Sequence, residues 1–172
     1  FGQVAGFDEA DAYSRKNRFD NGTRCAGIAA GELKLGVPAS RQLEFFGDTQ
    51  SLRVFQAALE QWRALGATLV EIDFEPFLKA ASRLYQGPWL AERYLATRRL
   101  FESDPAAMHP VVRQVIEPGA EFSALDYFDA AYQLRALKQQ ADAELAQVDL
   151  LLTPSLPRQF RIQELLEEPV KL

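Results

Sequence analysis

The sequence predicts an α/β fold in which helices outnumber strands and a mostly parallel sheet is flanked by helices. Three segments carry this prediction: a strand–helix–strand unit over residues 33–72, a long amphipathic helix that begins near Ser123, and a continuous apolar run at Val148–Thr153. A strand–helix–strand unit implies two parallel strands joined by a right-handed crossover. A continuous apolar run is typical of a strand buried on both faces of a sheet.

The strand–helix–strand unit has recognisable start and stop residues. Leu33–Val37 is a short apolar strand, and either Asp48 or Thr49 caps the helix that follows. Apolar residues recur in this helix at intervals of three and four, at Leu52, Phe55, Leu59 and Trp62. Gly66 is a stop signal for the helix, and Ala67–Ile72 alternates as the second strand.

Helical patterns dominate the rest of the chain. The expected helices are Glu75–Gln86, Pro88–Phe101, a shorter helix or turn at Val111–Ile116, a long helix from Ala124 to about Gln147, and Ile162–Glu168. Ser123 and Asp126 resemble a capping box at the start of the long helix. Its expected buried residues are Leu125, Phe128, Tyr132, Leu134 and Leu137.

Composition limits the classes of function. A chain of 172 residues with 48% hydrophobic and 25% charged residues is expected to form a single domain, residues 1–172. Its net charge of −5 and lack of a basic stripe argue against a nucleic-acid partner. No apolar run is long enough for a membrane span. The single cysteine, Cys25, cannot form an internal disulfide, which agrees with a cytoplasmic location.

The sequence offers no metal or cofactor site. His109 is the only histidine, and it lies between Met108 and Pro110 with no cysteine or histidine companion. We expect a structural or surface role for His109 rather than a catalytic one, because no serine–carboxylate context accompanies it.

The segment Leu84–Thr97 is the best candidate for a binding site. Its Gly87–Pro88 pair interrupts a helical pattern, so Tyr85 is expected at the end of one helix and Arg93 two turns into the next. There Arg93 would share a face with Trp89 and Ala96. An arginine held against an apolar wall can bind a small carboxylate through two hydrogen bonds. The alternative is a core helix with an arginine at its rim.

This segment resembles the amidase signature family, and within it the allophanate hydrolases. The spacing of Tyr85 and Arg93 matches a tyrosine–arginine pair that, in those enzymes, binds the carboxylate end of the substrate. Similar motifs follow one another along nearly the whole chain, namely Val4–Arg15, Leu35–Pro38, Gln42–Asp48 and Asp149–Pro154. The resemblance implies a partial amidase-signature fold.

The resemblance also shows what this chain lacks. The family's chemistry uses a lysine and two serines, one of them in a glycine-rich stretch. Here no two of the ten glycines are adjacent, and no serine has a neighbouring base or a glycine cradle. The chain begins at Phe1, in the middle of a family motif, so we expect a fragment of an amidase domain. It would contain no catalytic residue and would be inactive alone.

The resemblance implies part of a hydrolase that acts on linear amide C–N bonds. The reaction would be hydrolysis of allophanate to ammonia and carbon dioxide in urea degradation, without a cofactor. Its partners would be allophanate, the remaining part of the amidase chain and a urea carboxylase, which is either fused to the amidase or separate. Whether two copies form a homodimer is left undecided by the sequence. Two alternatives remain: another amidase, such as a generic amidase or an amidotransferase A-type subunit, and a non-catalytic α/β binding module.

Overall fold

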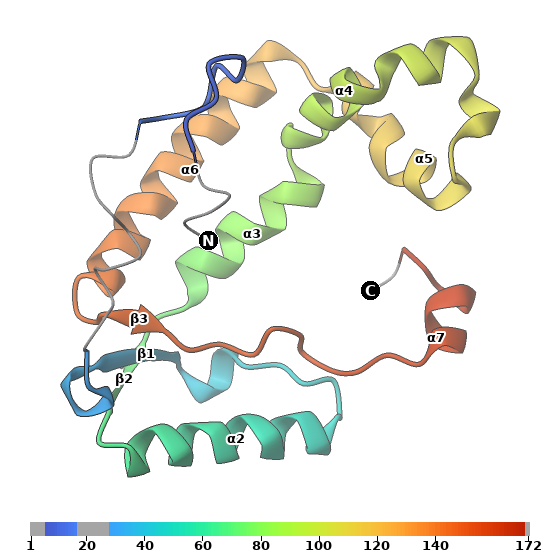
Figure 1. The fold of residues 1–172 in the computed structure, drawn as a ribbon. Coiled ribbons are helices and arrows are strands. Elements are labelled where there is room, and N and C mark those ends of the chain that lie inside the picture. Colours follow the sequence, from blue (N-terminus) through green and yellow to red (C-terminus); the bar gives the residue numbers. More distant parts are fainter. Residues whose placement is uncertain (1–5, 17–27, 171–172) are drawn as a thin grey trace.

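Three parallel strands form a small sheet at one end of the molecule (Figure 1). The structure is a computed structural model that describes residues 6–16 and 28–170. The strands are β1 (Lys34–Pro38), β2 (Thr68–Ile72) and β3 (Leu150–Leu151), in the order β2-β1-β3. β1 is the central strand, and it pairs in parallel with both neighbours. The parallel sheet predicted from the sequence is therefore confirmed.

Helix α2 (Thr49–Ala64) connects β1 to β2 and lies along one face of the sheet (Figure 1). The Asp48 carboxylate caps it by accepting hydrogen bonds from the N–H groups of Gln50 and Ser51. Gly66 follows the helix with a φ of +94°, a conformation that favours glycine. The buried Phe55 of α2 packs with Val37 and Phe45 to form the core on this face.

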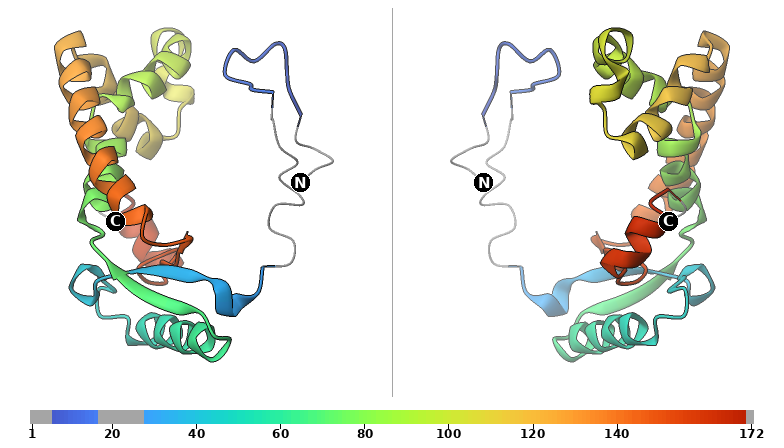
Figure 2. Two further views of the ribbon diagram at one scale, coloured as in Figure 1. Left: turned by 90° about the vertical axis from the view of Figure 1, so that its left-hand side faces the viewer. Right: turned by 90° about the vertical axis from the view of Figure 1, so that its right-hand side faces the viewer.

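Four further helices lie on the opposite side of the sheet from α2 (Figures 1 and 2). They are α3 (Glu75–Gln86), α4 (Trp89–Ser103), α5 (Pro110–Ile116) and α6 (Ala124–Leu145). Helices α3 and α6 pack side by side, and α4 packs against α5 and a 3₁₀ turn, η4 (Glu117–Glu121). A last helix, α7 (Ile162–Glu167), follows the sheet. Three further 3₁₀ turns are η1 (Ala30–Glu32), η2 (Ser40–Gln42) and η3 (Pro105–Ala107).

The predicted helix boundaries agree with the structure to within two residues at most ends. Ser123 and Asp126 form the predicted capping box at the start of α6, each side chain accepting from the other's backbone N–H. His109 caps α5, since its Nδ1 accepts a hydrogen bond from the N–H of Val111 at 3.3 Å. The expected structural role of His109 agrees with this contact.

Two predictions about burial are wrong. β3 covers only two residues of the apolar run at Val148–Thr153, and Leu150 is 53% exposed. This strand lies at the edge of the sheet, so within the described residues it has one neighbour instead of two. On α6, Leu137 is buried as predicted and Leu134 is half-buried, but Leu125, Phe128 and Tyr132 are 81, 54 and 68% exposed. An apolar stripe indicates that a face is covered, not which polypeptide covers it.

The exposed surface is large for the mass of the chain. It amounts to 13,367 Å², whereas a compact monomer of this mass exposes roughly 8,500 Å². Exposed large hydrophobic residues occur on all the major helices described above, including Val54 on α2, Leu78 on α3, Leu95 on α4 and Ile162 on α7. The described residues therefore leave much apolar surface without cover.

Candidate functional site

Tyr85 and Arg93 lie on two helices that meet at a sharp break. Helix α3 ends at Gln86, Gly87 and Pro88 follow, and α4 begins at Trp89. Gly87 has an extended backbone and cannot continue α3, while Pro88 has the fixed φ that suits a helix start. The break predicted from the Gly-Pro pair is confirmed. It places Tyr85 one residue before the end of α3.

The two side chains are in direct contact. The guanidinium carbon of Arg93 lies 4.7 Å from the centroid of the Tyr85 ring, within the range of a cation–π interaction. Nη1 of Arg93 also donates a hydrogen bond to the carbonyl oxygen of Leu84 at 3.2 Å. Tyr85 is 61% exposed and Arg93 is half-buried. The ring and the carbonyl together fix the position of the guanidinium.

Among the described residues, most of the hydrogen-bonding capacity of Arg93 has no partner. A guanidinium has five N–H donors, and within residues 6–16 and 28–170 only the bond to Leu84 occupies one of them. No carboxylate of those residues forms an ion pair with Arg93, and the hydroxyl of Tyr85 has no hydrogen-bond partner there. A positioned cation without a carboxylate partner can bind an anion, and its planar fork suits a carboxylate.

Helix α6 supports both helices of the site. Trp89 lies at the start of α4, and the centroid of its ring is 6.3 Å from the centroid of the Tyr127 ring. Nη2 of Arg83, near the end of α3, donates to Oε1 of Gln133 at 2.5 Å. Gln133 in turn donates to Asp129 at 2.6 Å. These contacts connect α6 to the residues on either side of the Gly87–Pro88 break.

Sequence reasoning missed these supporting residues. The shared face of Trp89 and Arg93 was predictable from helical spacing, and both side chains are half-buried, whereas Ala96 on the same face is exposed. The contacts of Tyr127 and Gln133 with the site join positions about 40 to 50 residues apart. No local pattern in the sequence indicates them. The Leu84 carbonyl is a backbone group, for which side-chain identity gives no signal.

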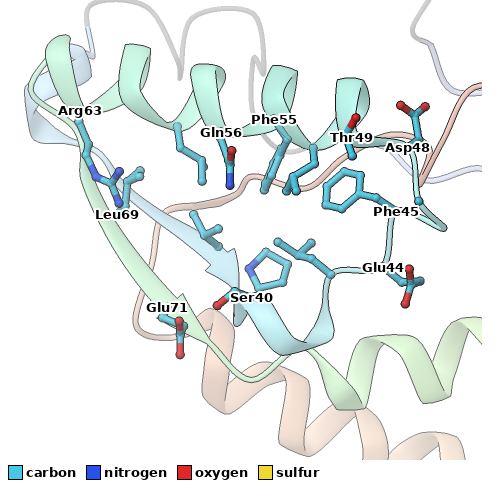
Figure 3. Close-up of a pocket in the computed structure, with 16 residues that line it drawn as sticks. Ser40, Glu44, Phe45, Asp48, Thr49, Phe55, Gln56, Arg63, Leu69 and Glu71 are labelled. Carbon is cyan, nitrogen blue, oxygen red and sulfur yellow. The ribbon is translucent and has the colours of Figure 1, made fainter.

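The cavity shown in Figure 3 is in another part of the molecule. Its volume is about 680 Å³, and it lies between α2 and strands β1 and β2. Its walls are mainly apolar, with Leu52, Phe55 and Leu59 from α2 opposite Leu69 of β2. Arg63 lies at one end and Asp48 at the other (Figure 3). Neither Tyr85 nor Arg93 lines this cavity, which is an incompletely filled space between the helix and the sheet.

The hydroxyls of four described serines serve local structure. Ser51 and Ser123 donate hydrogen bonds to the helix-capping carboxylates of Asp48 and Asp126, Ser14 accepts from the N–H of Asp8, and Ser82 donates to the Lys79 carbonyl. All four contacts lie within six residues of sequence. Such contacts are typical of caps and turns, and none of them has the arrangement of a serine nucleophile beside a general base.

The described residues offer neither a metal site nor a membrane span. No group of three or more histidine, cysteine, aspartate or glutamate side chains there could hold a metal ion. No helix in that part of the chain is long and apolar enough to cross a membrane. Cys25 and the first two residues of the Val4–Arg15 motif lie outside the described residues.

Known amidases are similar to this chain in sequence. No family profile matches it. Urea amidolyase of Lachancea kluyveri is 34% identical over 140 residues, which cover 80% of this chain and 8% of the relative. An amidase of Pseudomonas putida is 32% identical over 157 residues, or 90% of this chain and 33% of that enzyme.

A solved structure agrees with these relatives. The allophanate hydrolase of Kluyveromyces lactis superposes with a TM-score of 0.76 and 31% identity, over 81% of this chain and 23% of that one. This chain therefore spans less than a quarter of the solved enzyme and a smaller share of the urea amidolyase. Sequence and fold agree over four-fifths of the chain, which is similar to amidases and to the corresponding segment of allophanate hydrolase.

Proposed function

We propose that the chain forms part of an allophanate hydrolase and that it supplies the site for the substrate's carboxylate. The contact between Arg93 and Tyr85 carries the proposal, because it positions a cation that has no carboxylate partner among the described residues. The similarity to urea amidolyase and to a solved allophanate hydrolase supports the choice of substrate. The reaction is hydrolysis of allophanate to ammonia and carbon dioxide in urea degradation.

Each of the two residues has its own role in this proposal. Arg93 forms a bidentate pair with the carboxylate, and the Tyr85 hydroxyl donates a hydrogen bond to the same end of the substrate. A site that pairs a charge discriminates strongly between substrates, because a neutral amide leaves the guanidinium unmatched. Arg93 would thus favour allophanate over uncharged amides. The attacking and proton-transferring groups would come from the rest of the amidase.

The remaining part of the amidase is the partner that we propose for the exposed apolar surface. Leu125, Phe128 and Tyr132 are spaced at three and four residues on α6 and form one exposed apolar stripe. Leu150, in the edge strand β3, is also an exposed apolar residue. Contiguous exposed apolar residues of this kind mark interaction surfaces. A urea carboxylase, fused to the amidase or separate, would supply the allophanate.

The test is substrate preference of the complete amidase that contains this chain. Ammonia release should be far faster from allophanate than from biuret, in which a neutral amide replaces the carboxylate. Acetamide serves as a generic amide for comparison. A preference for acetamide or biuret would assign the chain to an amidase of another specificity, and no amide hydrolysis at all would favour the binding-module alternative.

A further inference from the structure

Gly119 brings two backbone segments unusually close together. It lies in η4 and is buried against the first turn of α4. A Cβ atom at this position would lie 2.4 Å from the carbonyl oxygen of Leu90 and 3.0 Å from the backbone nitrogen of Ala91. These are backbone atoms of a helix, so no side chain can rotate away to make room. Only glycine allows η4 to lie this close to α4.

This contact is one turn away from the proposed carboxylate site. Arg93 follows Leu90 by three residues, so both lie on the same side of α4. The carbonyl of Leu90 is the helical acceptor for the N–H of Tyr94, the residue after Arg93. Leu90 itself is 5% exposed and cannot move outward without opening the packing around it. The position of η4 therefore sets the position of the turn that carries Arg93.

We infer that Gly119 is a positioning residue for the substrate's carboxylate, acting through α4 on Arg93. This inference depends on the proposed function of Arg93. Ordinary van der Waals contact begins at 3.4 Å, so an alanine at 119 must move η4 and α4 apart by about 1 Å (3.4 − 2.4). Tyr85 and the Leu84 carbonyl belong to α3 and would stay in place, so the guanidinium would shift relative to both. A displacement of this size can cost about 100-fold in the contribution of a positioning group.

The experiment compares Gly119→Ala with the wild type in the complete amidase. We expect KM for allophanate to rise roughly 10- to 100-fold. KM for biuret as an alternative substrate, or its inhibition constant as a competitive inhibitor, should stay unchanged. Biuret has no carboxylate to pair with Arg93. A purely structural role would lower activity towards both compounds together. Equal changes for both, or no change for either, would overturn the inference.

A matched control and a second variant complete the test. Gly31→Ala is the same substitution at a glycine where a Cβ would lie 3.8 Å from the nearest atom, an ordinary contact, and it should leave both constants unchanged. If Gly119→Ala does not yield folded enzyme, Pro118→Ala loosens the same turn without placing an atom against Leu90. We expect Pro118→Ala to raise KM for allophanate by a smaller factor, again without an effect on biuret.

A double variant separates this inference from the proposed function. If Gly119 acts through Arg93, then Gly119→Ala should cause no further rise in KM for allophanate once Arg93 has been replaced by alanine. If Arg93→Ala does not discriminate between allophanate and biuret, the proposed function itself is wrong. If Arg93→Ala discriminates and Gly119→Ala does not, only the role of Gly119 is wrong.

Discussion

The guanidinium carbon of Arg93 lies 4.7 Å from the centroid of the Tyr85 ring, across the Gly87–Pro88 break that separates their helices. The eight-residue spacing in the sequence thus corresponds to a direct contact. Within one continuous helix, residues eight apart would be separated by about 12 Å along the axis. The break allows the second helix to turn back, so that Arg93 also reaches the Leu84 carbonyl.

The roles of the Tyr85 ring and hydroxyl can be separated by two substitutions. In the complete amidase, Tyr85→Phe removes only the hydroxyl and should cost roughly 0.5–1.5 kcal/mol in kcat/KM for allophanate, the contribution of one hydrogen bond. Tyr85→Leu also removes the ring beneath Arg93, so it should cost more. Steady-state kinetics measure both. Identical losses for the two variants would show that the ring does not position Arg93.

The 172-residue chain should have no amidase activity by itself. Four of its seven serine hydroxyls contribute to caps and turns, and its sequence lacks the glycine-flanked serine that the family uses. Ammonia release from allophanate by the purified chain should equal that of a buffer blank, with the complete amidase as positive control. Release above the blank, abolished by replacing one of the seven serines with alanine, would identify a nucleophile that we have not recognised.

The apolar stripe of α6 should be buried in the complete amidase. Phe128→Ala should then lower the free energy of unfolding by roughly 3–5 kcal/mol, because removing a buried ring leaves a cavity. In the isolated chain, where Phe128 is 54% exposed, the same change should have little effect. Gln139→Ala on the same helix is the control. Thermal unfolding of both forms measures the difference, and equal effects in both would contradict the proposed cover.

Asp48 should make stability depend on pH in acid. Hydrogen bonds from the backbone and side chain of Ser51, and then from the N–H of Gln159, lower the pKa of Asp48 to about 2. A carboxyl group whose pKa is depressed by folding stabilises the fold above its unfolded pKa of about 3.9, and this stabilisation is lost as the pH falls towards the folded value.

Asp48→Ala should therefore lower the melting temperature at pH 7, and its difference from the wild type should narrow as the pH falls from about 4 towards 2. Asp104→Ala is the control, because the Asp104 side chain caps no helix. A difference that stays constant over this range would mean that the ionised form of Asp48 does not stabilise the fold.

The sequence predicted local features better than contacts between distant segments. The cap of α2 at Asp48, the stop at Gly66 and the capping box at Ser123 depend on neighbouring residues, and all are confirmed. The parallel pairing followed from the strand–helix–strand pattern. The exposure of Leu150 and Phe128 could not be predicted, because an apolar pattern does not distinguish cover by this chain from cover by another polypeptide.

The candidate site was predictable in part. Spacing and the Gly-Pro break indicated Tyr85 and Arg93, since proline and glycine have strong local effects on a helix. Gly119 and Leu90 are 29 positions apart, and the local sequence around neither residue predicts their contact. The Pro118–Gly119 pair is a local turn signal, and a turn signal does not show what the turn contacts.

The central claim, that Arg93 binds the substrate's carboxylate, is tested most directly by the kinetics of Arg93→Ala in the complete amidase. Removing one partner of a desolvated guanidinium–carboxylate pair should cost roughly 2–4 kcal/mol in kcat/KM for allophanate. The loss should appear mainly as a raised KM, with biuret unaffected and the melting temperature little changed. Arg93→Lys should restore only part of the loss, because an ammonium lacks the planar fork. Equal turnover of wild type and Arg93→Ala at low allophanate, together with a lowered melting temperature, would show that Arg93 is a packing residue and would contradict this account.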